Sequence, residues 1–381
     1  MNARFQSQLE AAAESLGVPA VSAGYTVSDR VVRGAVGCDP DTVFRVASVT
    51  KPFTALLALA LLDLEASTGI WPEDVRIRHL LSHTSGFDCE CGDLARFGSG
   101  DDALSAAVSE LPGVRRFLGA EQAWSYANTG YWLAAHLASE RAAEPYEEAL
   151  MRHVVGPAGL ESTTFGEPEL AGTGPAAEGT AYPRARRASG GLVSNVTDLL
   201  RFGRRKLLRP QAAQLRVCHG KPVSGVYGLG LFGEQVGGTE VWGHVGSYGG
   251  FESSLLLVPG RGAVFAGLTN SSIGRRALRV LENAFFEEVL GAPRSIPATV
   301  DLPAGALERF AGTYVNGEGR YEVAANADGL AATFEDGEFW ARPIGERTFE
   351  ITHGDREAER FDFPLHGFGR FGSRLAEAVT G

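Results

Sequence analysis

A serine and a lysine three residues apart, Ser48 and Lys51, are the first pair in this chain that could carry out chemistry. Only three of the 35 basic residues are lysines, and arginine supplies the other positive charges. Lysine, unlike arginine, can lose its proton inside a protein and act as a base. The pair therefore predicts a serine nucleophile with Lys51 as its base. A structural alternative stays open on this pair alone, in which Ser48 caps a helix and Lys51 lies on the surface.

Pro52 indicates where these two residues lie. Proline has no backbone N–H and is tolerated only in the first turn of a helix, where that N–H has no intrahelical partner. Ser48 and Lys51 are therefore predicted to share one face at the N-terminus of a helix, whose positive end favours an ionised serine oxygen and a neutral amine. The apolar run over residues 53–62 is too short to cross a bilayer, which takes about 20 residues, and predicts a buried helix.

Two other segments offer polar side chains that could act with this pair. Tyr126 and Asn128 project to the same side of a predicted extended stretch and combine a phenolic proton carrier with an amide donor. His244 lies near two glycines on a predicted strand, where a ligand can approach the backbone and an imidazole can hold charge or donate a hydrogen bond. Each has a structural alternative: a helix cap for Asn128, a packed ring for Tyr126 and a core histidine for His244.

A metal site is a competing interpretation of His79, His83, Cys89 and Cys91. Two histidines four residues apart share a helix face, but Cys-x-Cys is not a usual zinc spacing and no second pair of ligands follows. We therefore expect neither a metal nor a cofactor. Four irregularly spaced cysteines are also too few for a disulfide framework, so we expect reduced thiols.

Taken together and in this order, the motifs resemble those of the serine β-lactamase and penicillin-binding protein superfamily, in its class C-like branch. Ser48-Val49-Thr50-Lys51 matches S-x-x-K, Tyr126-Ala127-Asn128 matches Y-x-N, and His244-Val245-Gly246 matches the K-T-G or H-x-G triplet. The resemblance spans about residues 5–290 and includes HLLSHTSG at 79–86, a segment that the family carries without a metal. The branch contains class C β-lactamases, D,D-carboxypeptidases, D-aminopeptidases, family VIII esterases and peptide-cyclising thioesterases.

The resemblance implies catalysis through an acyl-enzyme. Ser48 would attack a carbonyl carbon, Lys51 and Tyr126 would share the proton transfers, and Asn128 would bind a substrate amide or orient the lysine. These roles come from the family and not from spacing.

His244 stands where many members have a lysine, which is a departure from the class C β-lactamase triplet. The H-x-G form resembles peptidases, D-aminopeptidases and cyclising thioesterases more than efficient β-lactamases. By the same resemblance, the oxyanion hole would combine the backbone N–H of Ser48 with one from the His244 strand, next to Gly246, at Ser247.

The leading expectation is a serine hydrolase that cleaves an amide or ester through acyl-Ser48. It would be a peptidase or amidase with a preference for D-amino acids, or a carboxylesterase. One alternative is transfer of the acyl group to an amine, as in a transpeptidase or a peptide-cyclising thioesterase, and another is weak β-lactamase activity. A catalytically silent binding protein is the least supported interpretation.

The elements that must position these residues follow from hydrophobic periodicity. Strands at both ends of the catalytic part, with helices between them, predict an α+β fold: an antiparallel sheet flanked by helices plus a helical subdomain. A Gly, Pro and Ala-rich stretch at 167–187 predicts a surface excursion. The strands are expected over 20–27, 30–35, 226–233, 239–246, 251–259 and 263–270, and the helices near the N-terminus and over 52–65, 77–82, 103–110, 130–141, 145–155, 195–208 and 275–289.

The chain of 381 residues is long enough for a large domain and a small one. We expect a serine hydrolase domain over 1–291, a linker over 292–302 and a β-domain over 303–381, which resembles the lipocalin-like antiparallel β-barrel that several members carry. Its turns are expected at Asn316-Gly317, Asp328-Gly329, Asp336-Gly337 and His353-Gly354.

The net charge and the N-terminal segment indicate which classes of partner, and which location in the cell, to expect. The net charge of −11 and the scattered basic residues disfavour nucleic acid, because such binding needs clustered Lys and Arg that neutralise phosphates. A small molecule or a short peptide is the expected partner, with no membrane span. No secretory signal is visible, so we expect a cytoplasmic protein. The oligomeric state is left open.

Overall fold

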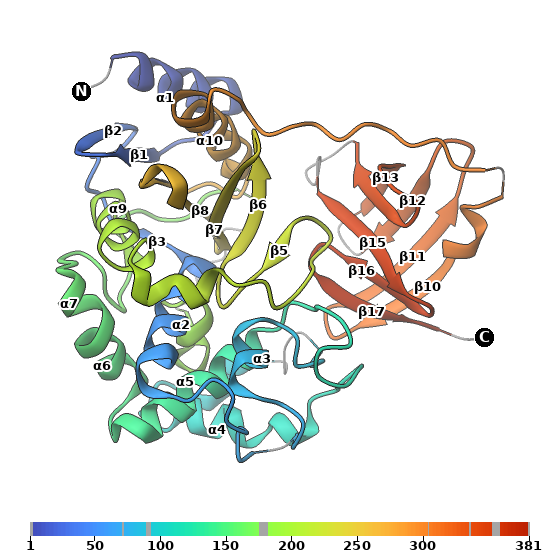
Figure 1. Cartoon of the computed structure of the whole chain (residues 1–381), viewed down its shortest axis with the longest axis horizontal. Coiled ribbons are helices and arrows are strands. Elements are labelled where there is room, and N and C mark those ends of the chain that lie inside the picture. The colour runs from blue at the N-terminus through green and yellow to red at the C-terminus, as the bar shows by residue number, and fades with distance from the viewer. Residues whose placement is uncertain are drawn as a thin grey trace.

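A seven-stranded antiparallel sheet runs through the larger part of the molecule, in the order β2-β1-β9-β8-β7-β6-β5 (Figure 1). The computed structural model describes residues 3–70, 72–88, 93–174, 182–303, 305–334, 337–352 and 359–379. The strands of this sheet are β1 (Val21–Val27), β2 (Arg30–Val36), β5 (Val226–Tyr227), β6 (Phe232–Val236), β7 (Thr239–Tyr248), β8 (Phe251–Val258) and β9 (Ala263–Thr269).

The early and late strands pair with each other. The β1–β2 hairpin joins the rest of the sheet through β1 and β9, with Val21 opposite Thr269. This pairing confirms the predicted α+β fold, because a strand from the start of the chain can reach a strand near residue 269 only if the intervening helices pack beside the sheet.

Helices α1 (Ala3–Leu16) and α10 (Gly274–Leu290) pack together on one face of the sheet (Figure 1). Phe5 and Leu9 are four residues apart, so they lie on one side of α1, and both are buried. The ring of Tyr25 on β1 lies between those of Phe5 and Phe285, at centroid distances of 5.3 and 5.7 Å. Aromatic and aliphatic side chains thus anchor both helices to the sheet.

The helical part of the chain packs against the other face and confirms most of the predicted segments. Helix α2 begins at Thr50, two residues before Pro52, so the proline still falls in the first turn, where its missing N–H costs no hydrogen bond. The helices are α2 (Thr50–Leu61), α3 (Ile77–Leu81), α4 (Ala103–Ser109), α5 (Asn128–Ala142), α6 (Tyr146–Leu150), α7 (Gly156–Ala158), α8 (Arg187–Gly190) and α9 (Val196–Phe202). Short π-helical turns at Met151–Val155 and Gly203–Leu207 continue α6 and α9.

The strand expected over 226–233 is wrong as a single run. The chain reverses between β5 and β6, where Tyr227 pairs with Phe232 and the Gly228 N–H donates to the Leu231 carbonyl at 2.8 Å. Gly230 has a φ of +78°, a conformation that glycine adopts without strain. The alternating glycines therefore form a hairpin turn and not a strand.

The surface excursion expected over 167–187 is also wrong at its C-terminal end. Residues 175–181 lie outside the described part, but Arg184–Arg186 form a 3-10 turn in which Ala185 is fully buried. Arg184 also pairs with Glu147 on α6, at 2.9 Å. This turn packs because it leads directly into α8, whose carbonyl groups contact the candidate active site.

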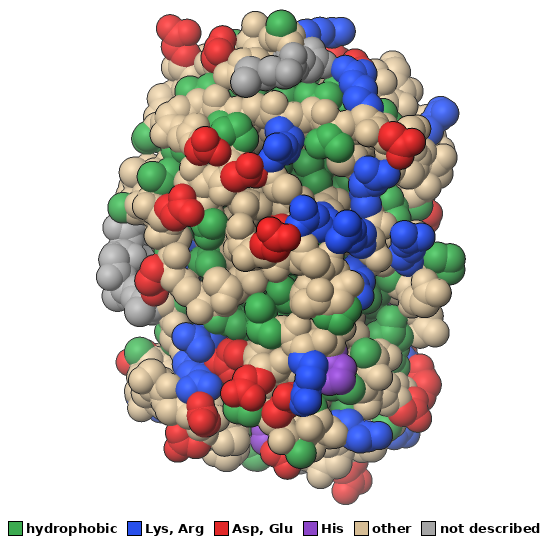
Figure 2. Space-filling view, turned by 90° about the vertical axis from the view of Figure 1, so that its left-hand side faces the viewer, with side chains coloured by type: hydrophobic (Ala, Val, Ile, Leu, Met, Phe, Trp, Pro, Cys, Tyr) green, Lys and Arg blue, Asp and Glu red, His purple; other side chains and the backbone are tan. Residues whose placement is uncertain are grey.

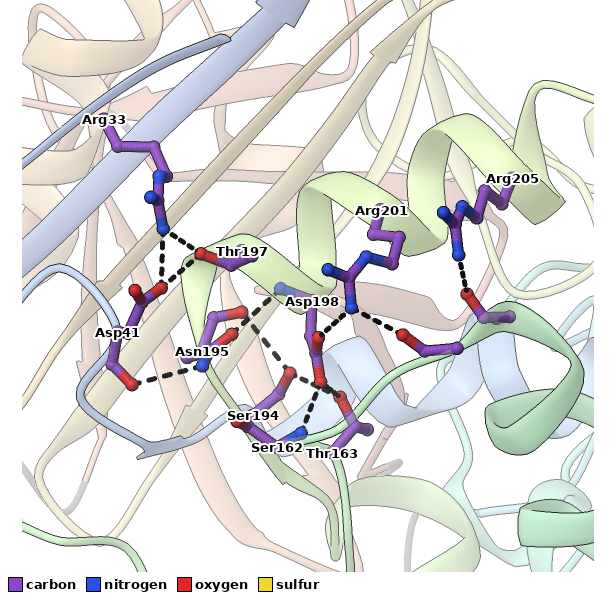
Figure 3. A network of polar contacts seen from close by, with 12 residues as sticks. Arg33, Asp41, Ser162, Thr163, Ser194, Asn195, Thr197, Asp198, Arg201 and Arg205 are labelled. Carbon is purple, nitrogen blue, oxygen red and sulfur yellow. Dashed lines mark hydrogen bonds and ion pairs between the residues drawn. The ribbon is translucent and has the colours of Figure 1, made fainter.

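A polar network fixes the short segment that joins α8 to α9 (Figure 3). The Asn195 side chain accepts from the Asp198 N–H at 2.9 Å, which makes Asn195 the N-cap of α9, and its amide donates to the Asp41 carbonyl at 3.1 Å. The buried Asp198 carboxylate accepts from the Ser162 N–H at 2.7 Å and from the Thr163 hydroxyl at 3.0 Å. The network joins segments far apart in sequence and fixes the N-terminus of α9.

The C-terminal part is a closed eight-stranded antiparallel barrel, as the fold class predicts (Figure 1). Its turns after Asn316 and before Leu330 agree with the predicted hairpins. Asp336 and the His353-Gly354 turn lie outside the described residues, and the domain boundaries at 291 and 303 stay predictions. The strands are β10 (Gly312–Asn316), β11 (Gly319–Ala325), β12 (Leu330–Phe334), β13 (Gly337–Pro343), β14 (Thr348–Ile351), β15 (Arg360–Leu365), β16 (Phe368–Phe371) and β17 (Arg374–Ala378).

The surface carries charges of both signs. Figure 2 shows the face that forms the left-hand side of Figure 1, on which acidic and basic side chains are intermixed with small apolar groups. Within the described residues, no helix has both the length and the apolar composition needed to cross a membrane.

Candidate active site

Ser48 lies in a strained turn directly before α2. The turn is a 3-10 helix, Ala47–Val49, and Ala47 has a φ of +44°, a region that residues with a side chain rarely adopt. Ser253 on β8 donates to the Val46 carbonyl at 2.7 Å and so ties the turn to the sheet. The strained backbone presents Ser48 at the junction between the sheet and the helical part.

Lys51 is the second residue of α2 and is fully buried, so the surface-lysine alternative is wrong. Its Nζ lies 3.0 Å from Ser48 Oγ and donates to the Ser189 carbonyl on α8 at 2.7 Å. The same Nζ lies 4.8 Å from the ring centroid of Tyr126 and 5.4 Å from that of Tyr131. The amine is therefore held against the serine oxygen by a carbonyl and two aromatic rings.

Tyr126 is the second side chain that contacts Ser48 Oγ. Its hydroxyl lies 3.0 Å from Ser48 Oγ, although 78 residues separate the two in sequence. Asn128 is buried at the first position of α5, and Ala127 occupies the N-cap position, so Asn128 is not the helix cap. The structure thus brings Ser48, Lys51 and Tyr126 into hydrogen-bonding distance and places Asn128 two residues further along the same segment.

The two histidines of the 79–86 segment each accept a hydrogen bond from a backbone N–H group. His79 Nδ1 accepts from the Arg76 N–H at 3.0 Å, and His79 Nε2 lies 3.2 Å from the Glu121 carboxylate. His83 Nδ1 accepts from the Ala127 N–H at 3.1 Å, between Tyr126 and Asn128. Burial holds the pKa of His83 well below its usual value, so this imidazole is neutral. Cys89 and Cys91 lie outside the described residues.

Gly246 lets β7 approach the backbone of the nucleophile. A Cβ atom at this position would lie 2.4 Å from the Val46 carbonyl oxygen and 2.7 Å from the backbone nitrogen of Ser48. Both distances are shorter than a carbon atom tolerates, so any side chain here would push β7 away from Ser48. The glycine is thus required for the close contact between the strand and the turn.

The register of β7 and β8 orients the backbone N–H of Ser247. A two-residue turn at 249–250, in which both glycines have positive φ, joins β7 to β8. Tyr248 and Phe251 flank this turn and therefore form the hydrogen-bonded pair next to it. The neighbouring pair, Ser247 with Glu252, is then non-hydrogen-bonded, and the Ser247 N–H points away from β8. On that side β6 pairs with β7 only as far as Gly243, so the Ser247 N–H points to an edge of β7 that β6 leaves unpaired.

His244 is neutral, and both of its ring nitrogens have partners in the protein. Burial, and to a lesser extent the positive charge that Lys51 carries when protonated, lowers the pKa of His244 to about 3. Nδ1 lies 2.6 Å from the Val245 carbonyl and must donate to it, so Nε2 accepts from the Tyr227 hydroxyl at 3.1 Å. Of the two roles expected for His244, holding charge or donating a hydrogen bond, the ring thus has only the second, and its N–H donates to the protein's own backbone.

Sequence reasoning missed Tyr227, which lies in an aromatic cluster under the site. Trp124, Tyr126, Tyr227 and Phe232 pack together there, and burial raises the pKa of Tyr227 well above its usual value, so the phenol keeps its proton. Tyr227 stands in a two-residue strand between glycines, and no local pattern marks it. Its role depends on its contact with His244, 17 residues further along the chain.

Comparisons with known proteins show the family and the fold of this chain. A family model described as Beta-lactamase matches residues 5–284. Penicillin-binding protein 4 of Amycolatopsis lactamdurans is 28% identical over 335 residues, covering 73% of this chain and 87% of that protein. A crystal structure of SurE with D-Leu has a TM-score of 0.79 at 23% identity and covers 99% of both chains. A D-stereospecific amidohydrolase from Streptomyces sp. has a TM-score of 0.61 at 24% identity, over 77% of this chain and 99% of that one, and both structural likenesses concern the fold.

Proposed function

The chain belongs to the beta-lactamase family of serine enzymes, and from that premise we propose that it hydrolyses an amide or ester of a D-residue through an acyl-enzyme at Ser48. One observation carries the proposal: Ser48 Oγ lies 3.0 Å from both Lys51 Nζ and the Tyr126 hydroxyl. A serine hydroxyl is a weak nucleophile until a neighbouring group takes its proton, and two groups capable of proton transfer are in place.

The contacts of Lys51 support its role as the base. A neutral amine has two N–H donors and one lone pair, and the Ser189 carbonyl accepts from one donor at 2.7 Å. The lone pair can then face Ser48 Oγ and take its proton as the oxygen attacks the substrate carbonyl carbon. Tyr126 shares the proton transfers at Ser48, because its hydroxyl hydrogen-bonds Ser48 Oγ and can orient that oxygen during the attack. It is also placed to pass a proton to the leaving group, and in the second step to take one from the attacking water.

The oxyanion of each tetrahedral intermediate would lie between Ser48 and β7. The backbone N–H of Ser48 and that of Ser247 are the proposed donors, because Gly246 brings the strand against Ser48 and the register turns Ser247 toward the same edge. His244 would act by holding this part of β7 and not by contacting the substrate, since both of its nitrogens are engaged.

The proposed preference for a D-residue rests on structural similarity to solved proteins. Two of the solved structures that share this fold are a D-stereospecific amidohydrolase and SurE with D-Leu. Their sequence identity to this chain is low, so they support a class of acyl group and not a particular substrate. Hydrolysis is the leading reaction, and transfer of the acyl group to an amine is the alternative that the same acyl-enzyme permits.

Intact mass after incubation with a fluorophosphonate tests the nucleophile. We expect a single adduct that is lost in Ser48→Ala and retained in Ser105→Ala, a matched change at an exposed serine on α4. An adduct that persists in Ser48→Ala, or none in the wild-type protein, would refute the proposal.

A substrate panel then tests the acyl group. D-amino-acid p-nitroanilides are compared with their L-enantiomers, p-nitrophenyl esters and nitrocefin, with and without an added amine. We expect turnover of the D-anilides above that of the L-anilides. Faster turnover of the L-series would overturn the D-preference, and an amide product with the added amine would favour acyl transfer over hydrolysis.

A further inference from the structure

The C-terminal barrel touches the segment that carries Tyr126. The turn between β16 and β17 brings the Ser373 carbonyl to the Tyr126 backbone N–H, at 2.8 Å. In the next residue pair, the Leu375 N–H donates to the Ser125 hydroxyl at 3.1 Å. Each of these two contacts joins residues about 250 positions apart, and the first is made by the backbone of the candidate catalytic residue Tyr126.

The Tyr126 segment belongs to no helix or strand, so other groups must hold its backbone. On one side, the Ser125 N–H donates to the His83 carbonyl at 3.0 Å and the Ala127 N–H donates to His83 Nδ1 at 3.1 Å. On the other side, the Tyr126 N–H donates to the barrel. Buried backbone groups need partners, and here the position of Tyr126 is set jointly by His83 and by the barrel.

Arg370 on β16 adds a buried side-chain contact between the barrel and this segment. Arg370 as a whole is 3% exposed, and its Nη1 donates to the Trp124 carbonyl at 3.0 Å and to the Lys221 carbonyl at 2.9 Å. Nε and Nη2 form a bidentate pair with the Asp362 carboxylate, at 2.8 and 2.5 Å. The planar fork of arginine satisfies all these partners at once, which the single ammonium of lysine cannot do.

We propose that Arg370 is a positioning residue for catalysis: it clamps the backbone two residues before Tyr126 and so fixes the phenol against Ser48. The barrel is then part of the active site. The proposal rests on the proposed function, in which the Tyr126 hydroxyl takes part in proton transfer at Ser48.

The test uses the full chain and the rate of fluorophosphonate adduct formation on Ser48, followed by intact mass. A misplacement of a reacting group by about 1 Å can cost about 100-fold in rate. We expect Arg370→Met to slow adduct formation by about 10- to 100-fold, Arg370→Lys to recover part of the rate, and circular dichroism to show a folded protein. Asp362→Asn keeps the guanidinium but weakens its anchor, and provides a milder variant in case Arg370→Met does not fold.

A double-mutant cycle separates positioning from general stability. If Arg370 acts through Tyr126, Arg370→Met slows the Tyr126→Phe protein much less than it slows the wild-type protein. The matched control is Arg115→Ala, which removes an exposed ion pair with Glu377 of the barrel and should leave the rate unchanged. Asp362→Asn replaces Arg370→Met in the cycle if only the milder variant folds.

The outcomes distinguish the two proposals. Equal slowing by Arg370→Met in both backgrounds, or a wild-type rate in that variant, would overturn the positioning role while the acyl-enzyme proposal stands. A Tyr126→Phe protein that reacts at the wild-type rate would instead remove Tyr126 from the proposed mechanism, and the role of Arg370 with it.

Discussion

The Tyr227 hydroxyl donates a hydrogen bond to Nε2 of His244 across 3.1 Å, and this contact, together with the bond from Nδ1 to the Val245 carbonyl, holds the imidazole in a single tautomer. Both rings are buried, so no water competes for either nitrogen. The pKa of His244, at about 3, keeps the ring neutral across the range in which enzymes work. His244, which stands where many family members have a lysine, is therefore the uncharged middle member of a buried hydrogen-bonded series from Tyr227 to the Val245 carbonyl.

Tyr227→Phe should destabilise the protein and free the His244 ring. The change leaves a buried acceptor without its donor, which costs about 1–3 kcal/mol. We expect a lower midpoint of thermal unfolding and a shift of the His244 Nε2 resonance in a ¹⁵N NMR spectrum. Tyr314→Phe is the control, since that hydroxyl donates to the Phe310 carbonyl inside the barrel. An Nε2 resonance that does not move in Tyr227→Phe would contradict the contact.

Glu252→Gln should change how stability depends on pH. Glu252 is buried, and desolvation raises its pKa to about 7, although the Ser247 hydroxyl and Arg275 act in the opposite direction. The folded state then keeps this proton between about pH 4.5 and 7, where the unfolded chain has lost it, so the wild-type protein loses stability as the pH rises through that window. The shift corresponds to a loss on the order of 3 kcal/mol.

We expect the difference in unfolding free energy between Glu252→Gln and the wild-type protein to grow in favour of the variant from pH 4.5 to 7. Urea unfolding at several pH values measures it. A difference that stays constant over this range would show that Glu252 titrates normally. Because Ser247 is a proposed oxyanion donor, the same variant also shows whether this carboxyl affects adduct formation on Ser48.

Glu282→Gln should be strongly destabilising. This glutamate is fully buried on α10 and pairs with Arg275 at 2.8 Å and with Arg294 at 2.6 Å, while Ser254 donates to it at 2.6 Å. Breaking a buried ion pair leaves uncompensated charge and costs about 3–5 kcal/mol. The two arginines lower the pKa of Glu282 to about 2, so this stability is present above about pH 4.5 and lost as the pH falls toward 2.

Glu288→Gln on the same helix is the matched control for Glu282→Gln. Glu288 pairs with Arg30 at 2.9 Å, but 35% of its side chain and 49% of that of Arg30 are exposed. An exposed pair contributes about 0–1 kcal/mol, so urea unfolding should barely change. Similar costs for the two variants would mean that the buried network does not hold α10 to the sheet.

The sequence was sufficient for the parts of this molecule that depend on local physics. Pro52 located the start of α2, and the spacing of Ser48 and Lys51 correctly placed both at its N-terminus. Periodicity gave α1 and the β1–β2 hairpin, but it failed at residues 226–233, where the same alternation fits a strand or a glycine turn. Tyr126 and His244 stood out by residue type, but only family resemblance joined them to Ser48, because nothing local relates residues 78 or more positions from the nucleophile.

The contacts that sequence reasoning could not find are tertiary. Tyr227 acquires its role only when β5 folds beside β7, and Arg370 only when the barrel packs against the Tyr126 segment. Both are common residue types in unmarked positions. A buried arginine with an aspartate eight residues away on a neighbouring strand looks the same in sequence as any exposed cross-strand pair.

Gly246→Ala should slow adduct formation on Ser48 and also lower the stability of the protein. The added Cβ would meet the Val46 carbonyl oxygen at 2.4 Å and the Ser48 nitrogen at 2.7 Å, so β7 must move away from the turn that holds the nucleophile. Since a displacement of about 1 Å can cost about 100-fold in rate, we expect a loss of that order in the fluorophosphonate reaction. Overpacking costs about 1–3 kcal/mol, which unfolding in urea measures. Gly260→Ala is the control, because its Cβ would meet no atom within 4 Å. Equal rates for the two variants would mean that the approach of β7 to Ser48 does not shape the oxyanion site.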